Sequence, residues 1–147
     1  MLKIPKMPIR EITSYNSEEM DAINGFLKLL DEHTPISQQM LKELISSDSS
    51  HLFFVFDEKE NCMGMLTVGI YVSPTGKKAW IEDVVVSENY RGQGVGKKLM
   101  EFAIQFAKQE EVSLLTLTSR PFRVAANKLY LKLGFERKET NVYKMTF

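Results

Sequence analysis

The chain has 147 residues, and its 19 Lys and Arg residues balance 19 Asp and Glu residues, so the formal net charge is zero. This length fits one domain, expected over residues 1–147, and the charge balance argues against a nucleic-acid binder that depends on a broad basic surface. The one cysteine excludes an intrachain disulfide, and no apolar run is long enough for a transmembrane helix. Pro5 and Pro8 interrupt the N-terminus, which lacks the apolar core of a signal peptide, so we expect a cytoplasmic protein without membrane contact.

The first part of the chain predicts a short strand and two helices. Residues 9–13 alternate in polarity as a strand does. Asn16 or Ser17 can cap a helix that runs to about Leu30. A second helix is expected to start at Thr34-Pro35, because proline is favoured at the first helical position.

The middle of the chain predicts an antiparallel meander of three strands. The strands are expected at residues 51–56, 62–71 and 78–86. Polar turn residues at 57–61 and 73–76 separate them.

Two chemically active side chains in these regions are interpreted as non-catalytic. His33 lies in the loop between the two helices, where it could touch a substrate but is more simply solvated. Cys62 lies in a strand, and no motif places a histidine beside it, so we interpret it as a small packing residue rather than a nucleophile. No cluster has the spacing of metal ligands, and no metal is expected.

The third strand of the meander leads into a glycine-rich turn and then into a helix that runs to about Gln109. Such a turn presents unpaired backbone N–H groups at a helix N-terminus, where phosphate binds readily. Lys97, in the first helical turn, has the wrong sign for the helix dipole, and a bound polyanion would remove that conflict. The turn consists of Arg91, Gly92, Gln93, Gly94, Val95 and Gly96.

Two familiar nucleotide-binding motifs do not fit this turn. A P-loop requires Ser or Thr where Lys98 stands. A dinucleotide-binding fingerprint requires a third glycine where Lys97 stands, and no repeated βαβ unit follows. A plain connection without a ligand stays open at this point.

The last part of the chain predicts a strand, a helix and two further strands. The strand at residues 112–118 follows a helical crossover and should pair in parallel with the strand before the turn. A helix over residues 122–133 is closed by Gly134. Residues 135–138 and 141–147 are expected as the final strands.

Two motifs in this order resemble the GNAT superfamily of N-acetyltransferases. The first is Arg-x-x-Gly-x-Gly after a valine-rich strand, and the second is Ala-Ala-Asn-Lys-Leu-Tyr-Leu-Lys-Leu-Gly-Phe at residues 125–135. The resemblance covers residues 81–135, and the remaining elements occur in a compatible order. It implies an α/β (α+β) fold with a mixed central sheet of about six to seven strands and about four helices.

The resemblance also implies a binding site for acetyl-CoA (coenzyme A). The glycine-rich turn and Lys97 would hold the pyrophosphate, and Asn127 would contact the cofactor, although family members commonly carry this Asn at the position of Arg123. The pantetheine arm would pair like an added strand with the backbone of Val84, Val85 and Val86. The N–H group of Val85 or Val86 could also face the thioester oxygen.

Two side chains are candidates for the proton transfers. The resemblance implies that Tyr130 is the general acid, whereas its helical position alone would fit a core tyrosine. Glu82 is the candidate base, with a solvated or cation-binding carboxylate as the alternative. We expect Glu82 and Asp83 to point to opposite faces of the sheet, so that only one can face the substrate, and Glu82 to share its face with Val84 and Val86.

The expected function is an acetyl-CoA-dependent N-acetyltransferase that acts on a primary amine of a small molecule or protein by direct attack. One alternative is an amino-sugar N-acetyltransferase, because Ile-Glu-Asp-Val-Val-Val-Ser at residues 81–87 resembles a strand of glucosamine-6-phosphate N-acetyltransferases. Another is a non-catalytic acyl-CoA-binding sensor on the same fold. The expected partner is a small-molecule or peptide amine, and the sequence leaves a homodimer open.

Overall fold

The computed structural model describes residues 6–30 and 34–147, so His33 lies outside the described residues. The chain divides into two compact units, residues 1–117 and 118–147, each with its own internal contacts. That residues 1–147 form one domain stays a prediction. Within the described ranges, none of the helices has the length and apolarity needed to cross a membrane.

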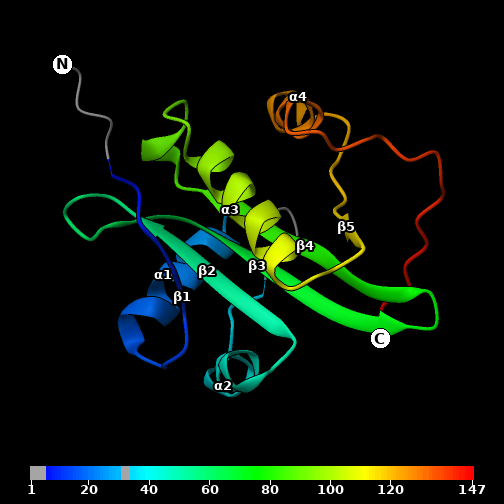
Figure 1. Ribbon diagram of the computed structural model, residues 1–147. Coiled ribbons are helices and arrows are strands. Elements are labelled where there is room, and N and C mark those ends of the chain that lie inside the picture. The colour runs from blue at the N-terminus through cyan, green and yellow to red at the C-terminus, as the bar shows by residue number, and fades with distance from the viewer. Residues whose placement is uncertain (1–5, 31–33) are drawn as a thin grey trace. The chain divides into compact units, whose positions relative to one another are not determined.

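The first unit is built on a five-stranded mixed sheet with the strand order β1-β2-β3-β4-β5 (Figure 1). Strands β1 to β4 pair antiparallel, and β5 pairs parallel to β4, as the helical crossover predicts. The strands are β1 (Ile9–Glu11), β2 (Ser50–Phe56), β3 (Cys62–Ser73), β4 (Gly76–Val86) and β5 (Leu114–Thr116).

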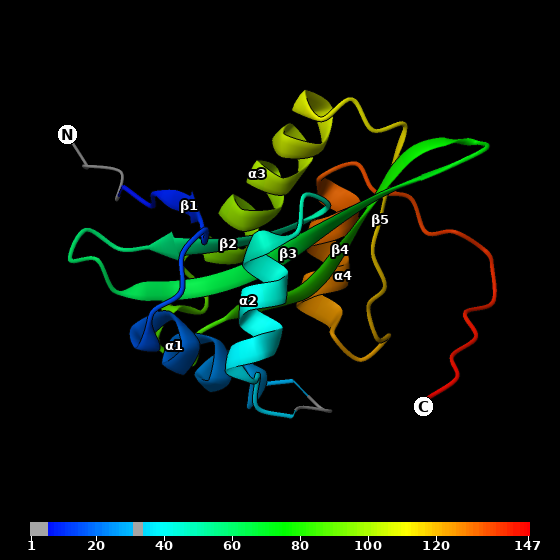
Figure 2. The same cartoon turned by 90° about the horizontal axis from the view of Figure 1, so that it is seen from below.

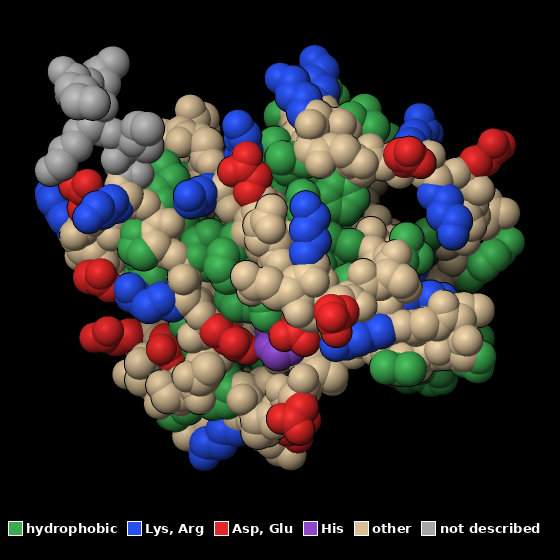
Figure 3. Space-filling view, viewed as in Figure 1, with side chains coloured by type: hydrophobic (Ala, Val, Ile, Leu, Met, Phe, Trp, Pro, Cys, Tyr) green, Lys and Arg blue, Asp and Glu red, His purple; other side chains and the backbone are tan. Residues whose placement is uncertain are grey.

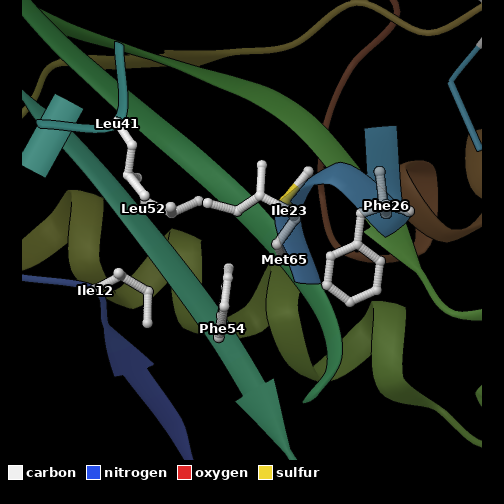
Figure 4. Close-up of a cluster of buried hydrophobic side chains, with 8 residues drawn as sticks. Ile12, Ile23, Phe26, Leu41, Leu52, Phe54 and Met65 are labelled. Atoms are coloured by element: carbon white, nitrogen blue, oxygen red, sulfur yellow. The ribbon is translucent and has the colours of Figure 1, made fainter. Parts of the chain in front are cut away.

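Helices cover both faces of this sheet. Helices α1 (Ser17–Leu27) and α2 (Gln38–Ser46) lie on one face, and α3 (Val95–Gln109) lies on the other (Figures 1 and 2). On the α3 side, the ring of Phe53 contacts those of Phe102 and Phe106, at centroid distances of 4.8 and 5.0 Å. Figure 4 shows the buried cluster on the opposite side, which consists of Ile12, Ile23, Phe26, Leu41, Leu52, Phe54, Met65 and Val85.

Helix α2 begins later than the sequence predicts. The expected start at Thr34 is wrong, because the helix begins at Gln38 and the hydroxyl of Ser37 caps it. The backbone N–H of Ile36 donates to Asn24 Oδ1 over 2.8 Å, which holds the preceding segment outside the helix. A hydrogen bond from α1 therefore overrides the local preference for proline at a helix start.

The second unit contains α4 (Val124–Lys132), and none of its described residues forms a strand. The two expected strands at 135–138 and 141–147 are therefore wrong, and the sheet has five strands rather than six to seven. A strand needs a neighbour to pair its backbone groups, and this unit supplies none. The large apolar side chains of the C-terminal segment are exposed, namely Val142, Tyr143, Met145 and Phe147.

Charged side chains of both signs are interspersed over the face shown in Figure 3. Among the described residues of each unit, Lys and Arg do not merge there into one continuous patch. This distribution agrees with the balanced composition of the chain.

Candidate functional site

The glycine-rich turn follows a short 3₁₀ helix, η1 (Glu88–Tyr90), and ends at the start of α3. Gly92 and Gly94 have φ angles of +74° and +81°, in the left-handed region that glycine adopts without a steric penalty. Gly94 is the N-cap residue of α3, and its carbonyl accepts the N–H of Lys98 over 3.0 Å. The predicted strand, turn and helix are thus all present.

The N-terminus of α3 is open to an anion. Gly94 offers no side chain to cap the helix, and the N–H groups of Val95, Gly96 and Lys97 have no partner within the helix. Their positive ends and the helix dipole favour a negative ligand at this position. The ammonium group of Lys97 lies 3.7 Å from Glu101, and its side chain is 61% exposed, so it is free to turn toward an anion.

The segment before the turn is tied to the β2–β3 hairpin. Tyr90 Oη donates to Asp57 Oδ2 over 3.0 Å, and Asn61 Nδ2 donates to the same oxygen over 2.9 Å. These hydrogen bonds, with the one from Asn61 first, lower the pKa of Asp57 below its usual value. The bonded carboxylate helps to fix the position of the turn, and no sequence motif indicated this contact.

Within the first unit, strand β5 leaves the second half of β4 uncovered. Strand β5 pairs with β4 only at residues 78–80. The N–H of Ser87 donates to the carbonyl of Met63 in β3 over 2.8 Å. Antiparallel pairing alternates, so Val85 also bonds to β3, whereas the N–H and C=O of Val86 point away from it. Val86 therefore presents its backbone groups at the edge that β5 leaves uncovered.

A β-bulge changes the direction of side chains just before this edge. Glu82 pairs with Thr67, and Val85 pairs with Met65, so three steps along β4 correspond to two along β3. Thr67 and Met65 lie on one face of β3, and cross-strand partners share a face. Glu82 and Val85 therefore point to the same face of the sheet, the one covered by α1 and α2.

The bulge corrects one expectation from the sequence. Glu82 does not share its face with Val84 and Val86, because the extra residue reverses the alternation after it. Asp83 has a φ of +52°, a left-handed conformation that Asp tolerates better than most residues. No glycine marks this position, so the bulge has little signature in the sequence.

The environment of Glu82 changes its acidity. Desolvation, and secondarily the charge of Asp83, raise the pKa of Glu82 above its ordinary value. Desolvation also raises the pKa of Asp83. A carboxyl group with a raised pKa holds a proton more readily, which suits a general base that works near neutral pH.

Glu82, itself exposed, lines a shallow and open pocket of about 460 Å³ in the first unit. Aromatic residues in this pocket were not predicted as site residues, although the spacing of two between Trp80 and Glu82 places them on one face of a strand. Tyr71 comes from the neighbouring strand, and only the pairing of β3 with β4 brings it to the pocket. The lining residues are Ser49, Ser50, Gly69, Ile70, Tyr71, Trp80 and Glu82.

Tyr130 lies on α4 in the second unit and is half-buried. Its ring makes an edge contact with Phe135, at a centroid distance of 6.1 Å. Desolvation raises the pKa of Tyr130, and the charge of Arg123 opposes this effect. The phenol therefore keeps its proton at neutral pH and can act as a proton donor.

Asn127 holds the start of the same helix. Its Nδ2 donates to the carbonyl oxygens of Arg123 and Arg120, over 2.8 and 3.0 Å. The amide nitrogen of Asn127 thus donates its hydrogen bonds within the second unit. Any hydrogen bond from a cofactor would therefore go to Oδ1, and the assignment of Asn127 to cofactor binding stays a prediction.

The thiol of Cys62 has the properties of a packing residue. Burial raises its pKa to about 12, so the thiolate is scarce at neutral pH. Its Sγ donates weakly to the carbonyl of Gly64 over 3.6 Å. Among the described residues, no group of three or more His, Cys, Asp or Glu side chains could hold a metal ion.

Comparison with known proteins agrees with the motifs. Residues 15–135 match the profile of the acetyltransferase (GNAT) family. Streptothricin acetyltransferase of Escherichia coli is 32% identical over 146 aligned residues, which cover 88% of this chain and 80% of that protein. N-acetyltransferase 8B of Rattus norvegicus is 32% identical over 95 residues, and the match spans 42% of its length and 62% of this chain.

A solved structure shares the fold. Glucosamine-6-phosphate N-acetyltransferase from Arabidopsis thaliana superimposes with a TM-score of 0.79 at 23% identity. The match covers 95% of this chain and 98% of that one.

Proposed function

The chain belongs to the GNAT family of acetyltransferases, and from that premise we propose that it transfers the acetyl group of acetyl-CoA to a primary amine of a small molecule or protein. The supporting observation is the combination, in one unit, of an uncapped helix N-terminus after a glycine turn and an open edge on the preceding strand. The helix N-terminus suits the phosphate end of such a thioester, and the strand edge suits its extended arm.

The residues of the first unit fit acetyl-CoA in its chemistry. The N–H groups of the turn and α3, with the charges of Arg91 and Lys97, would receive the pyrophosphate. In the segment Val84–Val86, the backbone groups that point away from β3, such as those of Val86, would pair with the amide groups of pantetheine. The N–H of Val86, rather than that of Val85, would face the thioester oxygen, because only Val86 points away from β3.

The proposed reaction is direct transfer without an acyl-enzyme. The amine nitrogen attacks the thioester carbonyl, the new C–N bond forms, and the C–S bond breaks. Glu82 accepts the proton that the amine loses, which its raised pKa supports. Tyr130 gives a proton to the departing thiolate, which its retained phenol proton supports.

The test is a thiol-release assay with acetyl-CoA and a panel of amines. The panel contains polyamines, amino sugars and their phosphates, aminoglycosides, arylalkylamines, amino acids and peptide N-termini, and streptothricin, which the name of the E. coli relative supplies. We expect free CoA to appear only when one class of amine is added, together with the acetylated product. Reactions without an amine and reactions without protein are the controls.

Three outcomes of this assay distinguish the proposed N-acetyltransferase from its two alternatives, an amino-sugar N-acetyltransferase and a non-catalytic sensor. Turnover on amino-sugar phosphates alone would favour the amino-sugar alternative. Tight CoA binding without thiol release on any amine would favour a sensor and contradict the proposed activity. Neither binding nor release by the folded protein would contradict both.

A further inference from the structure

The bottom of the pocket beside Glu82 is formed by Gly69, which has no side chain, in the middle strand of the sheet. Ser50, Gly69 and Trp80 form one row across β2, β3 and β4, since Ser50 pairs with Gly69 and Gly69 pairs with Trp80. A Cβ atom at Gly69 would meet nothing within 4 Å. The hollow therefore exists because no side chain stands between Ser50 and Trp80.

The walls of the pocket combine aromatic rings with one carboxylate. Trp80 is half-buried, and the exposed Tyr71 projects from the neighbouring strand. Among the described residues, Glu82 is the one acidic member of the lining, and no Lys or Arg belongs to it. Lys78 lies on the same face of β4, but its ammonium group bonds to Thr75 in the hairpin loop instead.

The chemistry of these groups suits an organic cation. Aromatic faces attract a cation or a flat apolar body, and a carboxylate gives a charge-assisted hydrogen bond to an ammonium group. A phosphorylated ligand would meet the Glu82 carboxylate, and the described lining holds no cation to offset its charge.

Granted the acetyl transfer proposed above, we propose that this pocket selects the acceptor, which is a primary amine carried on an aromatic or apolar body rather than a phosphorylated amino sugar. The ammonium group meets Glu82, and the body lies against Trp80 and Tyr71. Glu82 thus binds the acceptor before it accepts the proton that the amine loses.

The pocket contains its own reporter, because Trp80 is the single tryptophan of the chain. Acceptor binding can therefore be followed by tryptophan emission without any turnover, in the free protein and in the presence of CoA. Phenethylammonium should change the emission in a saturable way. The neutral analogue 2-phenylethanol should bind about tenfold more weakly or worse, since it lacks the charged hydrogen bond. Glucosamine-6-phosphate should leave the emission unchanged.

Two variants test the geometry. Gly69→Val fills the floor with a residue that suits a strand, so phenethylammonium binding should be lost while the melting temperature holds. Glu82→Gln should weaken phenethylammonium about tenfold and leave 2-phenylethanol unchanged. Gly25→Ala is the control, because Gly25 is exposed on α1, and a Cβ there meets nothing within 4 Å. It should bind phenethylammonium as the wild type does.

The outcomes separate this inference from the proposed activity. The inference is overturned if phenethylammonium leaves the emission of the folded protein unchanged, or if glucosamine-6-phosphate binds more tightly than phenethylammonium. It is also overturned if Gly69→Val acetylates phenethylammonium at the wild-type rate. Absence of thiol release with every amine, while the emission change persists, would instead count against the proposed acetyl transfer alone.

Discussion

Two glycines of β3 should respond in opposite ways to the addition of one methyl group. A Cβ atom at Gly64 would lie 2.6 Å from the carbonyl oxygen of Val85 and 3.3 Å from Cδ1 of Leu99. The oxygen belongs to the backbone of β4, and it would have to move about 0.8 Å before the contact became ordinary. Overpacking of this kind typically costs about 1–3 kcal/mol, so Gly64→Ala should destabilise the fold by that amount.

Gly69→Ala is the matched variant in the same strand. A Cβ atom at Gly69 meets nothing within 4 Å, and the residue does not have a positive φ. Loss of freedom in the unfolded chain should then stabilise this variant by about 0.4–1 kcal/mol. The two variants should therefore differ by about 1.5–4 kcal/mol.

Denaturant unfolding of both variants measures this difference, provided that the dependence on denaturant is equal for the two. Gly64→Ala should also bind CoA more weakly, because the displaced carbonyl of Val85 precedes the open backbone edge at Val86. Equal stability of the two variants would refute the close approach of β3 and β4 at Gly64.

Further predictions concern three titratable groups, Glu82, Tyr130 and Cys62. Glu82→Gln should lower turnover. In the wild type, the acid limb of the pH–rate profile should lie above the ordinary carboxylate range, because desolvation raises the pKa of Glu82. An unchanged acid limb in the variant would rule out Glu82 as the base, and Asp83→Asn is the paired control. The folded protein holds the Glu82 proton more tightly than the unfolded chain, so this group's stabilising contribution is lost as pH rises through the folded pKa. Glu82→Gln should therefore melt no lower than the wild type at neutral pH. Tyr130→Phe should lower turnover at least about tenfold, while the affinity for acetyl-CoA should change by less than about threefold. If this variant turns over at the wild-type rate when the chemical step limits the rate, Tyr130 is not the general acid. Cys62, with a thiol pKa of about 12, should react with iodoacetamide at neutral pH much more slowly in the folded than in the unfolded protein, and equal rates would contradict its burial.

The strand, turn, helix and cap positions that were predicted correctly depend on local sequence. The strand, glycine turn and helix over residues 76–109 follow from a β-branched run, from glycines at positive φ and from a helical apolar stripe. The cap of α1 by Asn16 is likewise a short-range hydrogen bond, to the N–H of Glu19 over 2.8 Å. These signals lie within a few residues of one another, so one sequence can reveal them.

The features that were missed depend on partners far along the chain. The bulge at Asp83 follows from pairing with β3, and the late start of α2 follows from a hydrogen bond to Asn24 on α1. Residues 143–147 alternate in polarity as a strand does, but alternation alone supplies no neighbour for the backbone. In the candidate site, Glu82 could be predicted from the motif that contains it. Tyr71 could not, because it reaches the pocket only through the register of β3 against β4.

The central claim is that the glycine turn and the N-terminus of α3 bind the pyrophosphate of coenzyme A. Gly94→Glu places a carboxylate at this helix end, in a left-handed backbone conformation that costs a non-glycine residue about 1–2 kcal/mol. Gly25→Glu makes the same change of charge at an exposed position of α1 and is the matched control.

Calorimetric titration of CoA into the wild type and both variants, each verified as folded by its melting curve, tests this claim most directly. The wild type and Gly25→Glu should bind CoA with equal affinity. Gly94→Glu should bind at least about tenfold more weakly, because its carboxylate meets the phosphate charge at close range. A folded Gly94→Glu variant with wild-type affinity for CoA would contradict the claim.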